Sequence, residues 1–157
     1  MQTFEDGMRR KWSFRIDFGK RQLIKSQTGC DVLQIDSDIE TLERFASDIE
    51  LLAEVIWILC GDEASKRSVS MESFSEGLTN EVFAKFRDLL LEEVAAFIQC
   101  LQPQRGERLR AAVEAMKKAG EELMGLQAQQ ARNLIDLLNS ELTSSSDTSS
   151  SLQESSV

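Results

Sequence analysis

The sequence predicts a mainly α (α+β) fold, in which a small N-terminal β-hairpin packs on a helical bundle and is followed by a long C-terminal helix and a disordered tail. Three observations lead to this prediction. Residues 12–18 alternate apolar and polar side chains, which is typical of a strand. Apolar residues recur at helical spacing between residues 39 and 101. Residues 107–142 then consist largely of good helix formers, ahead of a serine-rich end.

The first predicted element is a hairpin whose aromatic side chains share one face. Gly19 stands at a turn position after the alternating segment, and residues 21–25 are predicted to form the second strand. Because two strands alone are only marginally stable in water, we expect the apolar face to pack on helices. The apolar positions of the first strand are Trp12, Phe14, Ile16 and Phe18.

Two capping boxes mark the start of the helical region. Ser37 and Glu40 form the first box, and Ser47 and Glu50 repeat the same pattern further along the chain. In each box the serine hydroxyl can accept a hydrogen bond from the backbone N–H of the glutamate, and the glutamate side chain can accept one from the backbone N–H of the serine. We predict two helices that meet at Ser47. A single helix spanning both boxes is the alternative.

Further caps divide the next part of the chain. Ser70 is predicted to cap a short helix that ends at Gly77, and Thr79 to cap the helix after it. Pro103 and Gly106 are predicted to interrupt the chain beyond residue 101. The apolar stripe predicted for the helix over residues 82–101 consists of Phe83, Phe86, Leu90, Val94, Phe97 and Leu101.

Residues 107–142 are predicted to form a C-terminal helical arm. Three of the nine positions at a 4-3 spacing are not hydrophobic, so a strong autonomous coiled coil is not expected. Whether the arm folds back or projects stays open. The serine-rich residues 143–157 have too few apolar side chains to order themselves. We therefore expect a domain over 1–102, the arm over 103–142 and a tail over 143–157. The nine positions are Leu109, Val113, Met116, Gly120, Leu123, Gln127, Gln130, Leu134 and Leu137.

Composition excludes much of enzymology. The chain contains no histidine, no C-x-x-C pair and no glycine pattern of a phosphate-binding loop. We therefore expect no cofactor, no metal and no enzymatic activity. The net charge of −9 argues against nucleic-acid and anionic-membrane partners. No apolar stretch approaches the roughly 20 residues of a spanning helix, and no export signal is visible, so we expect a cytoplasmic protein.

The helix predicted over residues 47–60 is apolar almost all round. Leu51 and Ile58 lie near Glu54, and Trp57 lies near Glu50, on the side away from the expected core stripe. Such a helix is either buried on two faces or presents one face to a partner. Burial beneath the hairpin is the first interpretation. In the second, Leu51, Trp57 and Ile58 form an exposed apolar surface that binds a protein partner.

Several segments together suggest a family. A phenylalanine-rich first segment is followed by Thr28-Gly29-Cys30-Asp31, an acidic helix, and the run from Ile49 to Cys60. Val69-Ser70-Met71-Glu72-Ser73-Phe74 and a helix containing Glu92-Glu93-Val94 come next. Over about residues 12–101 the chain resembles the small tail-assembly-chaperone-type proteins encoded by tailed phages and prophages beside the tape-measure gene.

That resemblance implies a function without catalysis. A protein of this family would bind the long helical tape-measure protein in the host cytoplasm and keep it soluble while the tail tube polymerises. The alternative, from another class, is a cytoplasmic helical adaptor or regulator that dimerises through residues 107–142. A helical protein client and a second copy of the chain are thus the two partners that the sequence suggests.

Overall fold

The structure, a computed structural model, describes residues 1–146, with side chains to residue 143. As predicted, it is mainly helical, with a small antiparallel hairpin at the N-terminus and a long helix at the C-terminal end. The tail predicted over 143–157 is wrong for residues 143–146, which belong to the last helix, and from residue 147 on it lies outside the described residues. The elements, in chain order, are β1 (Gln2–Glu5), β2 (Lys11–Phe14), α1 (Phe18–Thr28), the 3-10 helix η1 (Val32–Gln34), α2 (Ile39–Ser47), α3 (Ile49–Lys66), α4 (Met71–Glu76), α5 (Asn80–Leu101) and α6 (Pro103–Ser146).

The hairpin uses a different partner strand from the one predicted. β2 pairs antiparallel with β1, with Gln2 opposite Phe14 and Glu5 opposite Lys11. The prediction of a strand over residues 21–25 is wrong, because these residues lie in α1. The Asp17 carboxylate accepts a hydrogen bond from the Lys20 amide and so starts a helix where the sequence suggested a turn.

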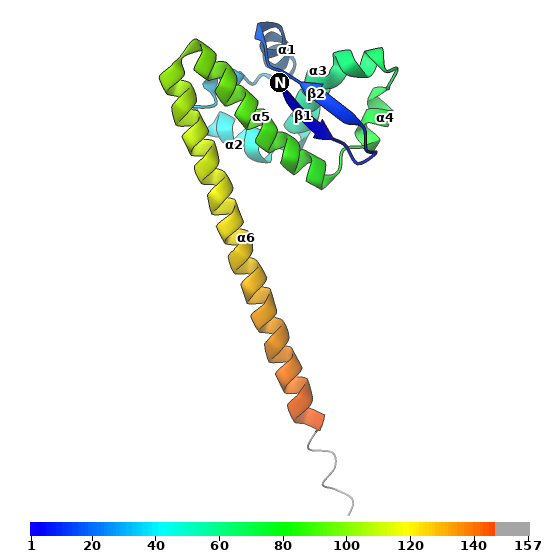
Figure 1. The fold of residues 1–157 in the computed structure, drawn as a ribbon, viewed down its shortest axis with the longest axis vertical. Coiled ribbons are helices and arrows are strands. Elements are labelled where there is room, and N and C mark those ends of the chain that lie inside the picture. The colour runs from blue at the N-terminus through cyan, green and yellow to red at the C-terminus, as the bar shows by residue number, and fades with distance from the viewer. Residues whose placement is uncertain (147–157) are drawn as a thin grey trace, which may run out of the picture. The chain divides into compact units, whose positions relative to one another are not determined.

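The alternating segment nevertheless faces the core as far as Ile16. The side chains of Trp12, Phe14 and Ile16 are buried, whereas Phe18 is 56% exposed because it already belongs to α1. The rings of Phe4, Phe14 and Phe86 contact one another at centroid distances between 5.2 and 6.2 Å. The hairpin therefore packs on helices, with β1 on α5 and β2 on α3 (Figure 1).

Helices α2 and α3 meet at Ser47, as the capping boxes predicted, but the capping residues are the aspartates. Asp38 caps α2, and the Asp48 carboxylate accepts a hydrogen bond of 3.0 Å from the Leu51 amide. The Ser47 hydroxyl instead donates to the Glu43 carbonyl inside α2. Each helix thus starts one residue later than a serine cap would place it. Aspartate and serine have similar N-cap preferences, so the sequence pattern alone does not choose between them.

The caps predicted for the next two helices are confirmed. Ser70 accepts from the Ser73 amide, α4 ends at Gly77, and Thr79 accepts from the Val82 amide at the start of α5. The predicted stripe of α5 is rotated by part of a turn, with Phe83 and Phe97 only partly buried and Leu101 44% exposed. The buried residues of α5 are Val82, Phe86, Leu90, Leu91, Glu93, Val94, Ala95 and Ile98.

The chain divides into two compact units, Met1–Val113 and Glu114–Val157. The boundary lies inside α6 rather than at residue 102, because Leu109 and Val113 are buried in the core of the first unit. The break predicted at Pro103 is confirmed, because α5 ends at Leu101, Gln102 is extended, and Pro103 is the first residue of α6, a position where proline is favoured. In the second unit, the structure describes a helix up to Ser146.

The prediction of an interruption at Gly106 is wrong, because Gly106 lies inside α6, where close packing requires a glycine. A Cβ atom added at Gly106 would lie 2.3 Å from the Cα atom of Gln99 in α5. Only glycine permits this approach of two helix backbones. Within residues 1–146, no helix has both the length and the apolar content that crossing a bilayer requires.

Candidate partner-binding surfaces

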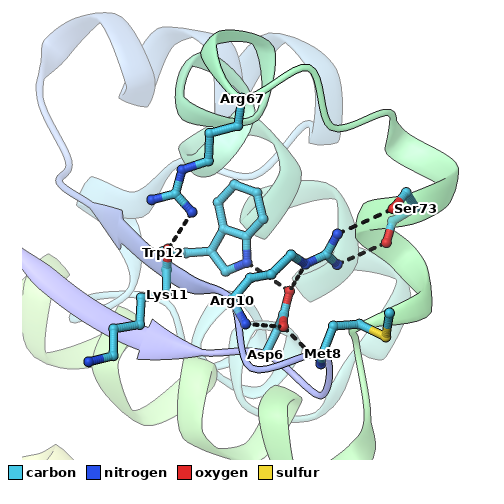
Figure 2. Close-up of polar contacts among 7 residues, drawn as sticks. All are labelled: Asp6, Met8, Arg10, Lys11, Trp12, Arg67 and Ser73. Carbon is cyan, nitrogen blue, oxygen red and sulfur yellow. Dashed lines mark hydrogen bonds and ion pairs between the residues drawn. The ribbon is translucent and has the colours of Figure 1, made fainter.

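The polar cluster at the hairpin turn is built around the buried Asp6 carboxylate (Figure 2). One carboxylate oxygen accepts hydrogen bonds of 2.9 Å from the amides of Met8 and Arg10. The other accepts from Arg10 Nε at 2.6 Å and from the indole N–H of Trp12 at 2.8 Å. Arg10 then donates to the backbone carbonyl of Ser73 in α4 at 2.9 Å. The cluster therefore ties the hairpin turn to α4.

The Trp12 ring is held by cations and by an aromatic neighbour. The guanidinium carbon of Arg67 lies 4.9 Å from the ring centroid and that of Arg10 lies 5.6 Å from it. The ring of Phe74 meets Trp12 edge-on at 4.8 Å. Arg67 also donates to the Lys11 carbonyl at 2.7 Å and pairs with Glu63. These contacts fix β2 against the end of α3.

This cluster is an anchor and lacks the features of an acid–base site. Burial raises the pKa of the Asp6 carboxyl, but the hydrogen bonds from Trp12, Arg10 and Met8 outweigh burial and leave the pKa below its ordinary value. A general acid or base near neutral pH needs the opposite shift. Asp6 stays ionised, and its oxygens are already occupied by N–H donors.

The other two buried carboxylates are partnered as well. Asp31 pairs with Arg21 at 2.6 Å and with Lys25 at 3.1 Å, and the hydrogen bond from Arg21 lowers the pKa of Asp31 to about 2. Glu93 accepts from the Ile16 amide at 3.3 Å and lies 3.4 Å from the amino group of Met1. Over the described part of the chain, every buried side-chain nitrogen and oxygen atom has a hydrogen-bond partner.

The cysteines and acidic residues do not gather into a metal centre. Cys30 and Cys60 are buried and Cys100 is exposed, and burial raises the pKa of the Cys60 thiol to about 12. A thiol with so high a pKa is a poor nucleophile. Among residues 1–146, no group of three or more cysteine, aspartate or glutamate side chains is placed to hold a metal ion.

The three residues predicted to bind a partner do not form one exposed surface. Leu51 and Ile58 are buried, with 3% and 7% of their surface exposed. Trp57 is partly exposed, and its ring contacts Phe74 at 5.4 Å. Helix α3 contacts α1, α2, α5 and β2, so it is covered on more than one side. Burial on two faces, the first interpretation of this apolar helix, is what the structure has.

Exposed apolar side chains follow one another along α6 within the second unit, whereas those of the first unit are scattered over several elements. Four of those on α6 follow the 4-3 spacing identified in the sequence, and they are 42–61% exposed. We call this set the leucine face. It consists of Met116, Leu123, Leu134 and Leu137.

A second apolar row lies beside the leucine face, and sequence analysis missed it. Its members also recur at a 4-3 spacing, and all are exposed. The signal was present in the sequence, but two alanines make the row less conspicuous than a row of leucines. We call it the 124–142 stripe. It consists of Met124, Ala128, Ala131, Ile135, Leu138 and Leu142.

A polar row completes the surface of this helical segment. Gln129, Asn133, Asp136 and Ser140 follow the same spacing on the side away from the 124–142 stripe, and the row begins with one exposed apolar residue, Leu126. The segment is therefore amphipathic, with two adjacent apolar rows and one polar row.

Comparisons of the chain with protein-family models, with curated proteins and with solved structures give no match.

Proposed function

We propose that the protein is a non-catalytic binding protein of the tail-assembly-chaperone kind. It binds a helical protein client, such as a tape-measure protein, and keeps the client soluble in the host cytoplasm. The observation that carries this proposal is the leucine face, because an exposed row of large apolar side chains on a helix fits a second amphipathic helix. In this proposal the client binds to α6, and not to Leu51, Trp57 and Ile58, the surface of the second interpretation of the sequence.

The charge of the protein supports the same role. With 18 basic and 27 acidic residues, the chain carries a net charge of −9. A large net charge of one sign opposes association between complexes and favours solubility. Once an aggregation-prone helical client is bound, the complex would keep this negative charge. The polar row of α6 would remain in water and present Asp136 to the solvent.

The chemistry of the first unit supports a role without catalysis. Its buried carboxylates serve as anchors for Arg10, Arg21 and backbone amides, and the pKa values of Asp6 and Asp31 are lowered. The first unit is then a folded body that carries the binding helix.

A second candidate function, an adaptor or regulator that dimerises through α6, is favoured by the 124–142 stripe.

Co-expression with a tape-measure protein tests the proposal. The variant Leu123→Glu/Leu137→Glu places two carboxylates on the leucine face, where burial against a client would leave them unpaired. We expect the yield of soluble co-purified client to fall on the order of tenfold or more, with an unchanged melting temperature of the first unit. Both replaced leucines are exposed, so the fold itself does not depend on them.

The matched control is Gln129→Glu/Ser140→Glu, which adds the same charge on the polar row. This control should retain the wild-type yield of soluble client. Equal loss in both variants would attribute the effect to added charge and not to the leucine face. A wild-type yield with Leu123→Glu/Leu137→Glu would overturn the proposed use of this face.

A further inference from the structure

The 124–142 stripe has a regular order of side-chain sizes that bears on its occupant. The stripe begins with Met124, continues with Ala128 and Ala131, and ends with the large residues Ile135, Leu138 and Leu142. Large residues thus dominate one end, and small residues fill the positions nearer the other. Met124, Ile135, Leu138 and Leu142 are each more than half exposed. A partner that covers them must therefore fill space beside the alanines and leave room beside the leucines.

We propose that residues 124–142 pair in antiparallel orientation with the same segment of a second copy of the chain. We place the two-fold axis level with Asn133. Every layer of the helix pair then combines a residue that precedes a four-residue step of the 4-3 repeat with a residue that precedes a three-residue step. Ala128 then faces Leu138 of the partner subunit, Ala131 faces Ile135 of the partner subunit, and Met124 faces Leu142 of the partner subunit. Two-fold symmetry repeats each of these contacts, which makes six layers.

Size complementarity selects the antiparallel orientation. In a parallel pair, each residue would face its own copy, so Ala128 and Ala131 would form two successive alanine layers. Such layers leave a gap next to the bulky layers of Ile135 and Leu138, and close packing disfavours gaps of this kind. In the antiparallel pair, the two alanines are each matched with a large residue. Four of the six layers then have nearly the same volume.

The interface is expected to be of modest size. Residues 124–142 extend over about 27 Å at 1.5 Å per residue, and two helices in contact over this length bury on the order of 1,000 Å². This area lies at the lower end for a specific complex, so we expect a micromolar rather than a nanomolar dimer. Leu134, 61% exposed, lies next to the axis and would face its own copy, adding apolar contact at the centre.

Few charges flank the proposed contact. Arg132 lies beside the axis and approaches its own copy, while Asp136, one turn further along, offsets part of that repulsion. Association is therefore driven by apolar burial, and added salt should not weaken it. The dimer covers Leu134 of the leucine face, whereas Leu123 and Leu137 lie further from the layers and stay open to a client. The inference does not depend on a client; it deepens the second candidate function, dimerisation through α6, by naming the segment, the orientation and the layers.

Sedimentation equilibrium of the full chain tests the pairing and its orientation together. The wild-type protein should be a monomer–dimer mixture at micromolar concentrations. Leu138→Ala should weaken the dimer on the order of 100-fold, because each of two layers would become a pair of alanines. Ala128→Leu should weaken it roughly tenfold or more by overpacking the same layers. The control Gln129→Leu adds a leucine on the polar row and should leave the dimer unchanged.

Mixing the two weakened variants gives the sharper result. In an antiparallel heterodimer of Ala128→Leu with Leu138→Ala, each altered layer again contains one leucine and one alanine. The mixture should therefore recover wild-type association, and native mass spectrometry should show the heterodimer in excess over both homodimers. Circular dichroism of each variant checks that the helix content is kept.

Three outcomes would overturn the proposal. A wild-type chain that is monomeric at 100 μM and above would exclude the second copy as occupant. Tighter association of Ala128→Leu would indicate a parallel pair, in which a leucine layer replaces an alanine layer. Failure of the mixed variants to form a heterodimer would exclude the antiparallel layers. None of these measurements requires a client, so their failure is distinct from failure of the proposed function.

Discussion

Trp12 donates its indole N–H to the Asp6 carboxylate at 2.8 Å, which joins the buried ring of β2 to the first residue of the hairpin turn. The same carboxylate holds Arg10, and Arg10 reaches α4 through Ser73. A strand pair that is only marginally stable by itself is thus attached to the helices by one acidic side chain.

Removal of this carboxylate should be costly. We expect Asp6→Ala to lower the free energy of unfolding by about 3 kcal/mol, because it leaves the buried N–H of Trp12 and the charge of Arg10 without their partner. Urea denaturation followed by tryptophan fluorescence measures the change. The control Ser73→Ala removes only the 3.2 Å contact with Arg10 and should cost about 0.5 kcal/mol. Similar midpoints for the two variants would contradict the anchoring role.

Two glycines should respond in opposite ways to the addition of one methyl group. Gly106→Ala places a Cβ atom 2.3 Å from the Gln99 backbone and should destabilise the first unit by about 2–3 kcal/mol. Gly61, inside α3, has open space at the Cβ position, so Gly61→Ala should stabilise by about 0.5–1 kcal/mol. Thermal melts of both variants decide this. Equal melting temperatures would show that α5 and α6 do not approach as closely as described.

Asp31 should make stability depend on acid pH. Its folded pKa of about 2 is below the ordinary value of 3.8, so its stabilising contribution is present above pH 4 and is lost as the pH falls towards 2. At pH 7 the contribution is about 2 kcal/mol. We expect Asp31→Asn to be less stable than the wild type by this amount at pH 7. The difference should shrink as the pH falls through 2 and vanish below it, and a difference of full size below pH 2 would exclude ionisation of Asp31 as its cause.

The effect on stability of adding a charge to α3 should depend on how exposed the replaced side chain is. Leu51→Glu or Ile58→Glu buries an unpaired carboxylate and should unfold the first unit or cost several kcal/mol. Ile49→Glu, on the same helix at a side chain that is 55% exposed, should change stability by less than about 0.5 kcal/mol. Circular dichroism melts compare the three proteins. Folded and stable Leu51→Glu protein would instead favour the partner surface that the sequence suggested.

Local capping chemistry explains why some helix boundaries could be predicted. Ser70 and Thr79 accept hydrogen bonds from amides three residues away, so the signal and the structure lie in the same short segment. At Ser47 and Asp48 two good caps are adjacent, and the position of the helix start was therefore missed by one residue. The partner of β2 could not be predicted in this way. β1 contains a single buried residue, Phe4, and its pairing depends on the cluster around Asp6.

The binding surface was harder to predict than the fold, because it depends on what each helix contacts. An all-round apolar pattern made α3 a candidate surface, yet four neighbouring elements account for that pattern. In α6 the 4-3 row begins with Leu109 and Val113, which belong to the core, and continues with exposed residues such as Leu123. The same sequence pattern thus describes both packing and a free face, and only tertiary structure separates the two.

The contact between Phe14 and Phe86 joins two residues that the ribosome synthesises at well-separated times. Phe86, which covers the hairpin, is made 72 residues after Phe14. At about 5–20 residues per second, the ribosome needs roughly 4–14 seconds to supply it. During that interval α3 can already pack on β2, but the rings of Phe4 and Phe14 lack the cover that α5 gives them. The N-terminal half of the chain is therefore exposed to aggregation or to cellular chaperones until α5 emerges, although the finished first unit conceals those same rings.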